Sequence, residues 1–419
     1  MEPAAADPRP VDGTDATTEG SAAVLDVERV VAGGFGLAHE QSGRVVLVEG
    51  ALPGERVEVV MTEVKERMAR AVTEQVLVPS PVRVAPPCPE VARGCGGCDL
   101  QHVAPGAQPD LRVEVVRDAL ARPARRGEVP VDIPVDPGIA LTSEHYRTSV
   151  RSAVVDGRLG FHRRRSDHVG PVDHCLVAHP LVDEIIADGR FPEAHEVTVR
   201  AGARTGERMA VVSPTVHPDT RVPDDVRLVG TDELRAGHRS WIHEEVDGRR
   251  YRISAQSFFQ ARPDGAEALL DAVRRALGDV DPDRDRLVDL YGGVGLFAAG
   301  LGLASPVLVE RSSSSVADAR RNLADVDATV VRVAVEKWRP SRAELLVADP
   351  ARTGLGRDGV RAVSAVGARR VALVSCDPAA LARDVALLTS AGYVAVGVEL
   401  VDMFPQTHHV EAVTTLELA

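Results

Sequence analysis

Two residues near the carboxyl-terminal end of the chain have the chemistry of a nucleophile and a base. Cys376 directly follows the apolar run Val371–Ser375, which has the character of a buried parallel strand. Pro378 stops this strand, so the thiol is expected at its carboxyl end, where open α/β sheets bind substrates. Glu411 offers a carboxylate that could remove a proton. A lone cysteine is more often a packing residue than a catalytic one, so the rest of the chain must decide.

The pattern around Cys376 predicts a doubly wound α/β domain. Apolar residues with helical spacing follow Pro263, and short apolar runs then alternate with helical stretches. These runs predict strands at residues 286–291, 306–310, 329–333, 344–348, 371–375, 393–401 and 410–418. Strands that alternate with helices form a largely parallel sheet with helices on both faces.

A glycine turn and acidic residues predict a cofactor site at one edge of this sheet. The turn Gly292–Gly295 follows a strand that contains Asp289, and the absence of a G-x-G-x-x-G pattern argues against a dinucleotide. Glu310 ends the next strand, where ribose hydroxyls are held, and Asp349 ends a later one. Together these features favour a nucleoside cofactor such as S-adenosylmethionine.

The other cysteines form a candidate metal site. Cys88, Cys95 and Cys98 are clustered in a Pro/Gly-rich loop, and Cys175 lies farther along the chain. Four thiolates suit tetrahedral zinc or a [4Fe–4S] cluster. Only one C-x-x-C pair is present, which favours iron–sulfur over a zinc ribbon, while coincidental free cysteines are the third interpretation.

The composition divides the chain into segments. Residues 1–21 are acidic and aperiodic, which predicts a disordered tail. Short β-branched runs over residues 22–80 predict a small barrel of four or five strands. Residues 81–253 predict a central domain of short antiparallel strands, with a helix over 108–121 that can pack on the α/β domain of residues 254–419.

A local excess of arginine suggests a phosphate-contacting face. The chain has a net charge of −13, yet residues 147–165 contain six arginines against one acid, Asp156. The alternative is a solvated strand edge. The amino-terminal residues lack the features of a signal peptide, and no apolar run is long enough to cross a membrane. We therefore expect a cytoplasmic monomer without an obligate protein partner.

Several motifs together resemble one enzyme family. The barrel segment resembles the RNA-binding TRAM domain through Gly33–Gly36 and Val48–Glu55. The other motifs are CGGCDLQH, the FFQ that ends at Gln260, DLYGGVGLF, DPARTG, SCDPAALARD and DMFPQTHHVE. With them, residues 22–419 resemble the RNA 5-methyluridine methyltransferases, specifically the subgroup with a TRAM domain and an iron–sulfur cluster.

The resemblance implies a class I S-adenosylmethionine-dependent methyltransferase domain and a role for each site residue. Cys376 matches the nucleophile and Glu411 the general base. The S-adenosylmethionine-binding positions are matched by Gln260, Tyr291, Glu310 and Asp349. The ligands of a [4Fe–4S] cluster are matched by Cys88, Cys95, Cys98 and Cys175, and the arginine-rich segment matches part of an RNA-binding domain.

The implied reaction is methylation of carbon 5 of a uridine, with ribosomal RNA favoured over tRNA as the substrate. A thiolate must add at carbon 6 before carbon 5 can react, so the target base must be unstacked. A carboxylate at Asp377 is expected to disfavour the neighbouring thiolate. Two alternatives stay open: a pyrimidine C5 methylase that acts on another nucleic acid, and a catalytically silent iron–sulfur protein that binds RNA.

Overall fold

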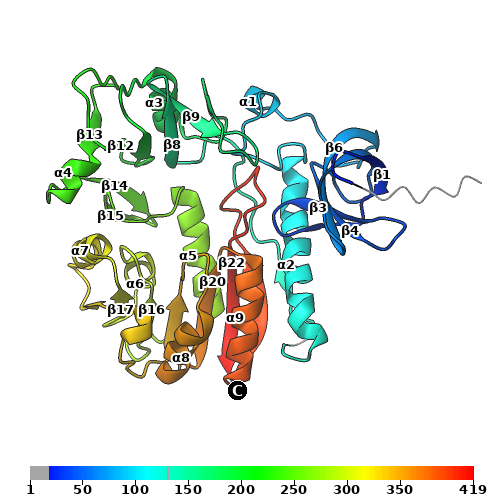
Figure 1. Ribbon diagram of the computed structural model, residues 1–419. Helices are drawn as coiled ribbons and strands as arrows, with labels where there is room; N and C mark the ends of the chain where they lie inside the picture. Colours follow the sequence, from blue (N-terminus) through cyan, green and yellow to red (C-terminus); the bar gives the residue numbers. More distant parts are fainter. Residues whose placement is uncertain (1–17, 130–131) are drawn as a thin grey trace, which may run out of the picture. The chain divides into compact units, whose positions relative to one another are not determined.

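The computed structural model describes residues 18–129 and 132–419 (Figure 1). These residues form two compact units, of which the first ends at Pro81 and the second contains Val82–Ala419. Of the tail predicted over residues 1–21, residues 1–17 lie outside the described part. No helix within the described ranges has the length and apolar character needed to cross a bilayer.

The first unit is a β-sheet that closes on itself. Its strands are β1 (Ala22–Asp26), β2 (Arg29–Val31), β3 (Phe35–His39), β4 (Val45–Glu49), β5 (Arg56–Val64) and β6 (Met68–Val78). They pair in the order β1-β5-β6-β4-β3-β2, so the two outer strands are consecutive in sequence. This order closes the sheet around a core that includes Val46, Val57 and Ala69.

The prediction of four or five strands for this barrel is wrong, because the described residues form six. The sequence run VLDVERVV reads as one strand but changes partners in its middle. The N–H of Val27 donates to the carbonyl oxygen of Glu55, whereas the N–H of Glu28 donates to that of Leu37. β1 therefore pairs with β5, and β2 pairs with β3.

A second sheet occupies the central part of the chain. Its strands are β8 (Ser149–Val155), β9 (Arg158–His162), β10 (Val169–Pro171), β11 (Glu196–Ala201), β12 (Arg208–Ser213) and β13 (Val226–Gly230), in the order β10-β9-β8-β11-β12-β13. Helix α3 (Pro180–Asp188) packs on this sheet through Val182, Ile185 and Ile186, and α4 (Thr231–Arg235) follows β13.

The prediction of an antiparallel arrangement holds for most of this sheet but is wrong for β12 and β13, which pair in parallel. The chain covers residues 214–225 between these two strands. A connection of this length lets the chain return to the start of β12 before β13 begins, which a tight hairpin turn would not allow.

A third sheet contains the strands predicted over residues 286–418. They are β16 (Leu287–Leu290), β17 (Val307–Glu310), β18 (Thr329–Arg332), β19 (Leu345–Ala348), β20 (Arg370–Ser375), β21 (Tyr393–Leu400) and β22 (Ala412–Leu418). All seven predictions of a strand are confirmed. The sheet order is β18-β17-β16-β19-β20-β22-β21-β7, in which β7 (Val135–Asp136) was not predicted because two residues carry no periodic signal.

Helices cover this third sheet (Figure 1). They are α2 (Gln108–Arg125), α5 (Pro263–Leu277), α6 (Leu296–Gly300), α7 (Ser313–Asn322), α8 (Gly356–Val366) and α9 (Pro378–Ser390); the short segments α1 (Pro89–Ala92), η1 (Pro105–Ala107) and η2 (Val335–Lys337) lie in connections. The predicted helices at 108–121 and after Pro263 are confirmed. α2 packs against α9, and α5 buries Leu269, Leu270 and Val273 completely.

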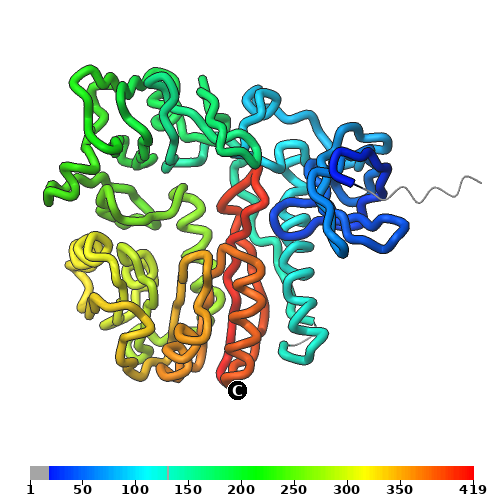
Figure 2. The backbone as a smooth tube through the Cα atoms, viewed as in Figure 1, coloured from blue at the N-terminus to red at the C-terminus, as the bar shows by residue number. Residues whose placement is uncertain are grey.

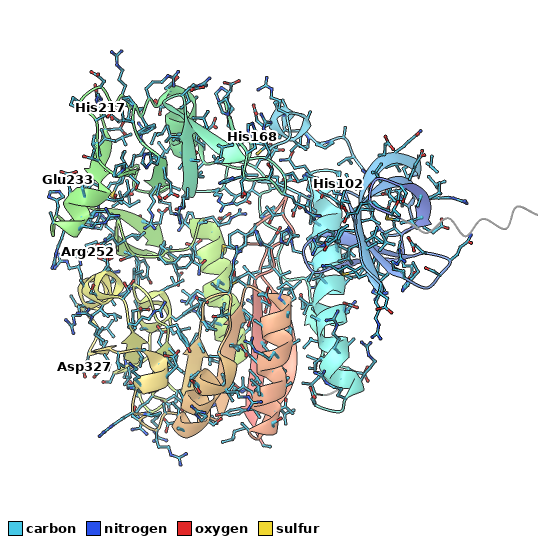
Figure 3. All side chains as sticks on the ribbon, in the orientation of Figure 1. His102, His168, His217, Glu233, Arg252 and Asp327 are labelled. Carbon is cyan, nitrogen blue, oxygen red and sulfur yellow. The ribbon has the colours of Figure 1, made fainter. Side chains whose placement is uncertain are left out.

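A buried carboxylate anchors the hairpin of β14 (Trp241–Val246) and β15 (Arg249–Ser254) to α7. Asp318 on α7 is fully buried and accepts hydrogen bonds from the Arg252 Nε (2.6 Å), the Ser254 N–H (2.8 Å) and the Ser257 hydroxyl (2.6 Å). Figure 3 shows Arg252 between this hairpin and α7. The anchor holds the segment after β15, which leads to Gln260.

Removal of this carboxylate should destabilise the second unit. In Asp318→Ala, Arg252 and Ser257 lose their buried partner, which should lower the free energy of unfolding by about 2–4 kcal/mol. The shift in the unfolding midpoint of that unit, followed in denaturant, measures this loss. Asp327→Ala removes an exposed carboxylate and serves as the control, with an expected change within about 0.5 kcal/mol. Equal midpoints for the two variants would contradict the proposed anchoring role.

Candidate active site

The predicted catalytic pair lies at one edge of the third sheet. Cys376 follows the carboxyl end of β20, and β22 runs antiparallel to β20, so β22 begins at the same edge. Ser375 pairs with Ala412 in the register of these two strands. Cys376 and Glu411 are the next residues outward from this pair, so they lie at the adjoining ends of neighbouring strands.

Burial and nearby carboxylates disfavour the thiolate in the ligand-free protein. Burial raises the pKa of Cys376 to about 11, with further contributions from Glu411 and Asp349, while the positive charge of Arg352 acts in the opposite direction. The expectation that Asp377 is the disfavouring carboxylate is not met. Its side chain instead accepts a hydrogen bond from the Ala380 N–H (2.7 Å) and caps α9.

The two acidic groups around the thiol are themselves shifted towards the neutral form. Glu411 is buried, and this burial raises its pKa well above the usual value; Asp349 adds to the effect and Arg352 opposes it. Burial also raises the pKa of Asp349 to about 7. An edge with this many partly desolvated carboxylates favours a ligand that carries positive charge.

The glycine turn after β16 supplies a backbone that a ligand can approach closely. Gly293 and Gly295 have positive φ values of 54° and 94°, and Tyr291 has a φ of 61°, which costs a non-glycine residue about 1–3 kcal/mol. Glu310 at the end of β17 accepts hydrogen bonds from the N–H groups of Gly293 (3.2 Å) and Ser312 (2.6 Å). The turn and the acidic residue are therefore held together.

Asp289 contributes a second acidic group beneath this turn. It is fully buried, and its Oδ2 accepts a hydrogen bond from the Ala298 N–H (3.1 Å). Its Oδ1 has no hydrogen-bond partner among the described residues. Burial raises the pKa of Asp289 to about 8, and Asp349 and Glu310 add to the shift. A buried carboxylate oxygen without a donor is an unsatisfied group that a bound ligand could pair with.

The structure brings most of the predicted cofactor residues to one edge but places Gln260 on a separate segment. Tyr291, Glu310 and Asp349 lie at the carboxyl ends of β16, β17 and β19. Gln260 is buried between β15 and α5, where it lines a small pocket with Arg200. The sheet thus positions three of the four residues directly, whereas the hairpin anchored by Asp318 positions the fourth.

The four clustered cysteines share one cavity in the central part of the chain. Cys88 precedes α1, Cys95 and Cys98 follow α1, and Cys175 lies between β10 and α3. All four line a cavity of about 410 Å³. Burial raises the pKa of Cys98 to about 12, and the other three thiols of the set add to this shift; burial also raises the pKa of Cys175 to about 11, with a further contribution from Cys95.

These thiols do not form a site for a single ion in the arrangement seen. Within residues 18–129 and 132–419, no three His, Cys, Asp or Glu side chains are grouped so that they could hold one metal ion. Zinc bonded to thiolates at about 2.3 Å requires a tighter grouping. The prediction of a metal centre thus rests on the shared cavity and on the donor set.

Comparisons with known proteins identify the family. Residues 16–73 match the TRAM domain, and residues 337–418 match the tRNA (Uracil-5-)-methyltransferase family. The chain is 38% identical to an RNA methyltransferase of Streptomyces coelicolor, over 94% of this chain and 92% of that protein. It is 31% identical to the 23S rRNA (uracil(1939)-C(5))-methyltransferase RlmD of Shewanella amazonensis, over 94% and 95%.

The chain belongs to the RNA uracil-5-methyltransferases. The crystal structure of Pyrococcus abyssi tRNA (uracil-54, C5)-methyltransferase in complex with S-adenosyl-L-homocysteine superposes with a TM-score of 0.68 at 22% identity, over 94% of this chain and 99% of that one. The predicted enzyme class and the α/β methyltransferase fold with an amino-terminal TRAM domain are therefore confirmed, and RNA is the kind of substrate.

The structure of this methyltransferase also reveals site residues that the sequence analysis missed. Arg352 is the cation that acts on Cys376 and Glu411, although its motif, DPARTG, predicted a role only for Asp349. Asp384 on α9 is fully buried and accepts hydrogen bonds from the N–H groups of Leu355 (2.6 Å) and Gly356 (3.1 Å). It thereby holds the loop that carries Arg352, a contact that no local pattern indicates.

The charge of Arg352 should control how readily Cys376 ionises. In Arg352→Gln the pKa of the thiol should rise further, so the thiolate fraction at pH 8 should fall by about threefold or more. The rate of iodoacetamide alkylation of the peptide that contains Cys376, followed by mass spectrometry, measures this change. The rate should increase with pH up to about pH 11 in the wild-type protein and up to a higher pH in Arg352→Gln.

Two further variants serve as controls for this alkylation experiment, one with no expected effect and one with the opposite effect. Arg357→Gln removes an exposed arginine from α8 and should leave the alkylation rate unchanged. Glu411→Gln removes a group that contributes to the raised pKa of the thiol, so it should speed alkylation at pH 8 rather than slow it. Slowing in both Arg352→Gln and Arg357→Gln would show that general charge, and not the position of Arg352, sets the rate.

Proposed function

We propose that this enzyme methylates carbon 5 of a uridine in structured RNA, with Cys376 as the nucleophile and Glu411 as the general base. Its methyl donor is S-adenosylmethionine, and it acts on RNA in the cytoplasm. Ribosomal RNA is the favoured substrate. The observation that carries this proposal is the strand register, in which Ser375 pairs with Ala412 and leaves the thiol and the carboxylate on adjoining strand ends.

The features of the sheet edge fit the proposed methyl donor. Gly293 and Gly295 open the backbone, Glu310 is fixed beside them, and Asp289 has an unpaired buried oxygen. Tyr291, Glu310, Asp349 and Gln260 are the residues that would hold S-adenosylmethionine. When bound, S-adenosylmethionine supplies an electrophilic methyl group and a positive charge that favours the Cys376 thiolate.

The protein residues account for the remaining steps. The Cys376 thiolate adds to carbon 6 of uracil, which forms a sulfur–carbon bond and moves an electron pair into an enolate, so that carbon 5 becomes nucleophilic. After carbon 5 has gained the methyl group, the Glu411 carboxylate takes the carbon-5 proton. The carbon 5–carbon 6 double bond forms again, the sulfur–carbon bond breaks, and Cys376 leaves as a thiolate.

The environment of Glu411 suits this role. A base is most effective when its pKa lies near the working pH, and burial together with Asp349 moves the pKa of Glu411 in that direction. The positive charge of Arg352 opposes this rise in the pKa of Glu411. The same arginine favours the Cys376 thiolate. A single cation therefore influences both the nucleophile and the base.

The choice between RNA substrates rests on relatives. The Shewanella enzyme, whose name assigns it to 23S rRNA, is 31% identical over nearly the whole chain. The archaeal enzyme, whose name assigns it to position 54 of tRNA, shares the fold at 22% identity. We therefore favour a uridine of ribosomal RNA, and tRNA is the substrate to test against it.

The four cysteines fit a [4Fe–4S] cluster better than a single zinc ion. They converge on one cavity of about 410 Å³, but no three of the described metal-binding side chains are close enough to share one ion. A cube of four irons takes one thiolate per iron and so holds the four sulfur atoms farther apart than a single ion does. Its role would be structural, because no step at Cys376 or Glu411 needs an electron.

Methyl transfer to RNA from a strain that lacks the gene tests the reaction. Wild-type enzyme with methyl-labelled S-adenosylmethionine should yield labelled 5-methyluridine, and purified ribosomal and transfer RNA, assayed separately, identify the substrate. Cys376→Ala should lose at least about a thousandfold in turnover, because the adduct cannot form. Glu411→Gln should instead accumulate a methylated protein–RNA adduct that survives denaturation.

The pair of variants separates the two roles. Label in RNA from Cys376→Ala at the wild-type rate, or an adduct that forms in Cys376→Ala but not in Glu411→Gln, would contradict the assignment. Absence of label from every RNA, with enzyme that contains its full iron content, would contradict the proposed reaction itself.

The iron–sulfur centre gives a separate prediction. Cys98→Ser should lose most of its bound iron and inorganic sulfide, whereas Cys376→Ser should retain both and lose only methyl transfer. Iron and sulfide analysis of anaerobically purified protein measures this difference. If the wild-type protein contained stoichiometric zinc and no sulfide, the site would bind a single zinc ion, and the proposed cluster would be wrong.

A further inference from the structure

Glu411 reaches the sheet edge at the end of a connecting segment, residues 401–411, which we term the base loop. Figure 2 shows it as the red segment that extends beyond the strands β21 and β22. The Val401 N–H donates to the Glu411 carbonyl oxygen (2.8 Å) and closes the loop at its base. Within the loop, Gln406 has a φ of 67°, a backbone conformation that residues other than glycine rarely adopt.

Residues from the amino-terminal part of the same compact unit hold this loop in place. Arg112 and Asp402 form a buried ion pair (2.9 Å), and the Tyr146 hydroxyl donates to the Pro405 carbonyl oxygen (2.9 Å). The Gln108 Oε1 accepts from the Gln406 N–H (2.7 Å), so the strained residue is fixed by α2. Arg112 and Asp402 line a small pocket together with Glu411, so these contacts support the start of the loop.

The second half of the base loop is held by Asp99. Its Oδ1 accepts a hydrogen bond from the His408 backbone N–H (2.8 Å), and its Oδ2 pairs with the His408 Nδ1. The His408 ring packs against the His409 ring, with centroids 4.4 Å apart. His409 is two residues from Glu411, so Asp99 holds the part of the loop that leads directly to Glu411 in sequence.

Asp99 also belongs to the loop of clustered cysteines. It follows Cys98 directly, and the next residue, Leu100, donates its N–H to the Gln406 carbonyl oxygen (3.0 Å). The cysteine loop and the base loop are therefore joined by consecutive residues of one segment. This junction connects the cavity of the four cysteines to the carboxylate at the sheet edge.

We propose that Asp99 is a positioning residue that fixes the base loop through His408 and so keeps Glu411 aligned for removal of the carbon-5 proton. This inference rests on the proposed function, because it assumes that Glu411 is the base. It extends that function by making the cysteine loop part of the support of the catalytic base. A displaced base should slow adduct breakdown, whereas the addition of Cys376 and methyl transfer should continue.

The test compares Asp99→Ala, Asp99→Asn and the wild-type enzyme. In Asp99→Ala, kcat should fall by about tenfold or more with little change in KM for RNA, and the methylated adduct should accumulate during turnover. Asp99→Asn keeps an acceptor for the His408 N–H, so its kcat should lie between those of Asp99→Ala and the wild type. Iron content should equal that of the wild type in both variants.

Glu207→Ala is the matched control, because Glu207 holds a histidine in the same way at another place in this unit. It accepts from the His243 N–H (3.1 Å) and pairs with the His243 Nδ1 (3.0 Å). This variant removes a comparable histidine–carboxylate contact without touching the base loop. Its kcat and adduct level should match the wild type.

Amide hydrogen exchange supplies a readout that does not depend on activity. Peptides that cover residues 401–411 should exchange faster in Asp99→Ala than in the wild type, and those peptides should be unchanged in Glu207→Ala. Wild-type kinetics, adduct level and exchange in Asp99→Ala would overturn the inference and leave the proposed function intact. Loss of activity in strict proportion to lost iron would overturn it as well, because Asp99 would then act only through the cluster.

Failure of the proposed function has a different signature. If the wild-type enzyme formed no adduct and transferred no methyl group, Glu411 would not be a base and both proposals would fall. If the wild type methylated RNA but Glu411→Gln formed no adduct while Asp99→Ala did, the base would be another residue supported by the same loop. That result would overturn the assignment of Asp99 as the residue that aligns Glu411.

Discussion

The antiparallel insertion of β22 between β20 and β21 is the constraint on which the site depends. Side chains alternate between the two faces of a strand, so a shift of register by one residue would turn Val410 to the place of Glu411. Burial favours this register, because Ala412, Thr414 and Leu416 share one completely buried face of β22, whereas Thr415 and Glu417 on the other face are only partly buried. The pairing that stabilises the sheet is thus the pairing that brings the carboxylate to Cys376.

The desolvated carboxylates at this sheet edge cost the ligand-free protein stability, and a positively charged ligand would offset that cost. Asp289, Asp349 and Glu411 are all desolvated enough to shift their pKa values upward, and Arg352 is the cation that offsets part of this cost. A positively charged methyl donor would relieve the same repulsion on binding. Burial and these carboxylates therefore disfavour the Cys376 thiolate in the ligand-free protein, and a bound cation would favour it.

Features that were predictable from sequence are those that leave a local pattern. The central strands β16, β19 and β20 are buried on both faces, so each reads as a short apolar run, and the glycine turn and the strand-end acids follow directly. The parallel pairing of β12 and β13 and the short strand β7 have no such pattern. The contact between Asp99 and His408 joins residues 309 positions apart, and only the folded chain brings them together.

This long-range contact also changes how the catalytic unit is defined. Residues 254–419 contain Cys376, Glu411 and the glycine turn, which suggests a self-sufficient domain. Yet the base loop contains a left-handed Gln406 and a buried Asp402, and their partners are Gln108 and Arg112 on α2. Without those partners, an unpaired buried carboxylate and a strained backbone would favour a different loop conformation. The proposed nucleophile and base thus belong to the third sheet, whereas the loop that ends at Glu411 is held by residues between Asp99 and Tyr146.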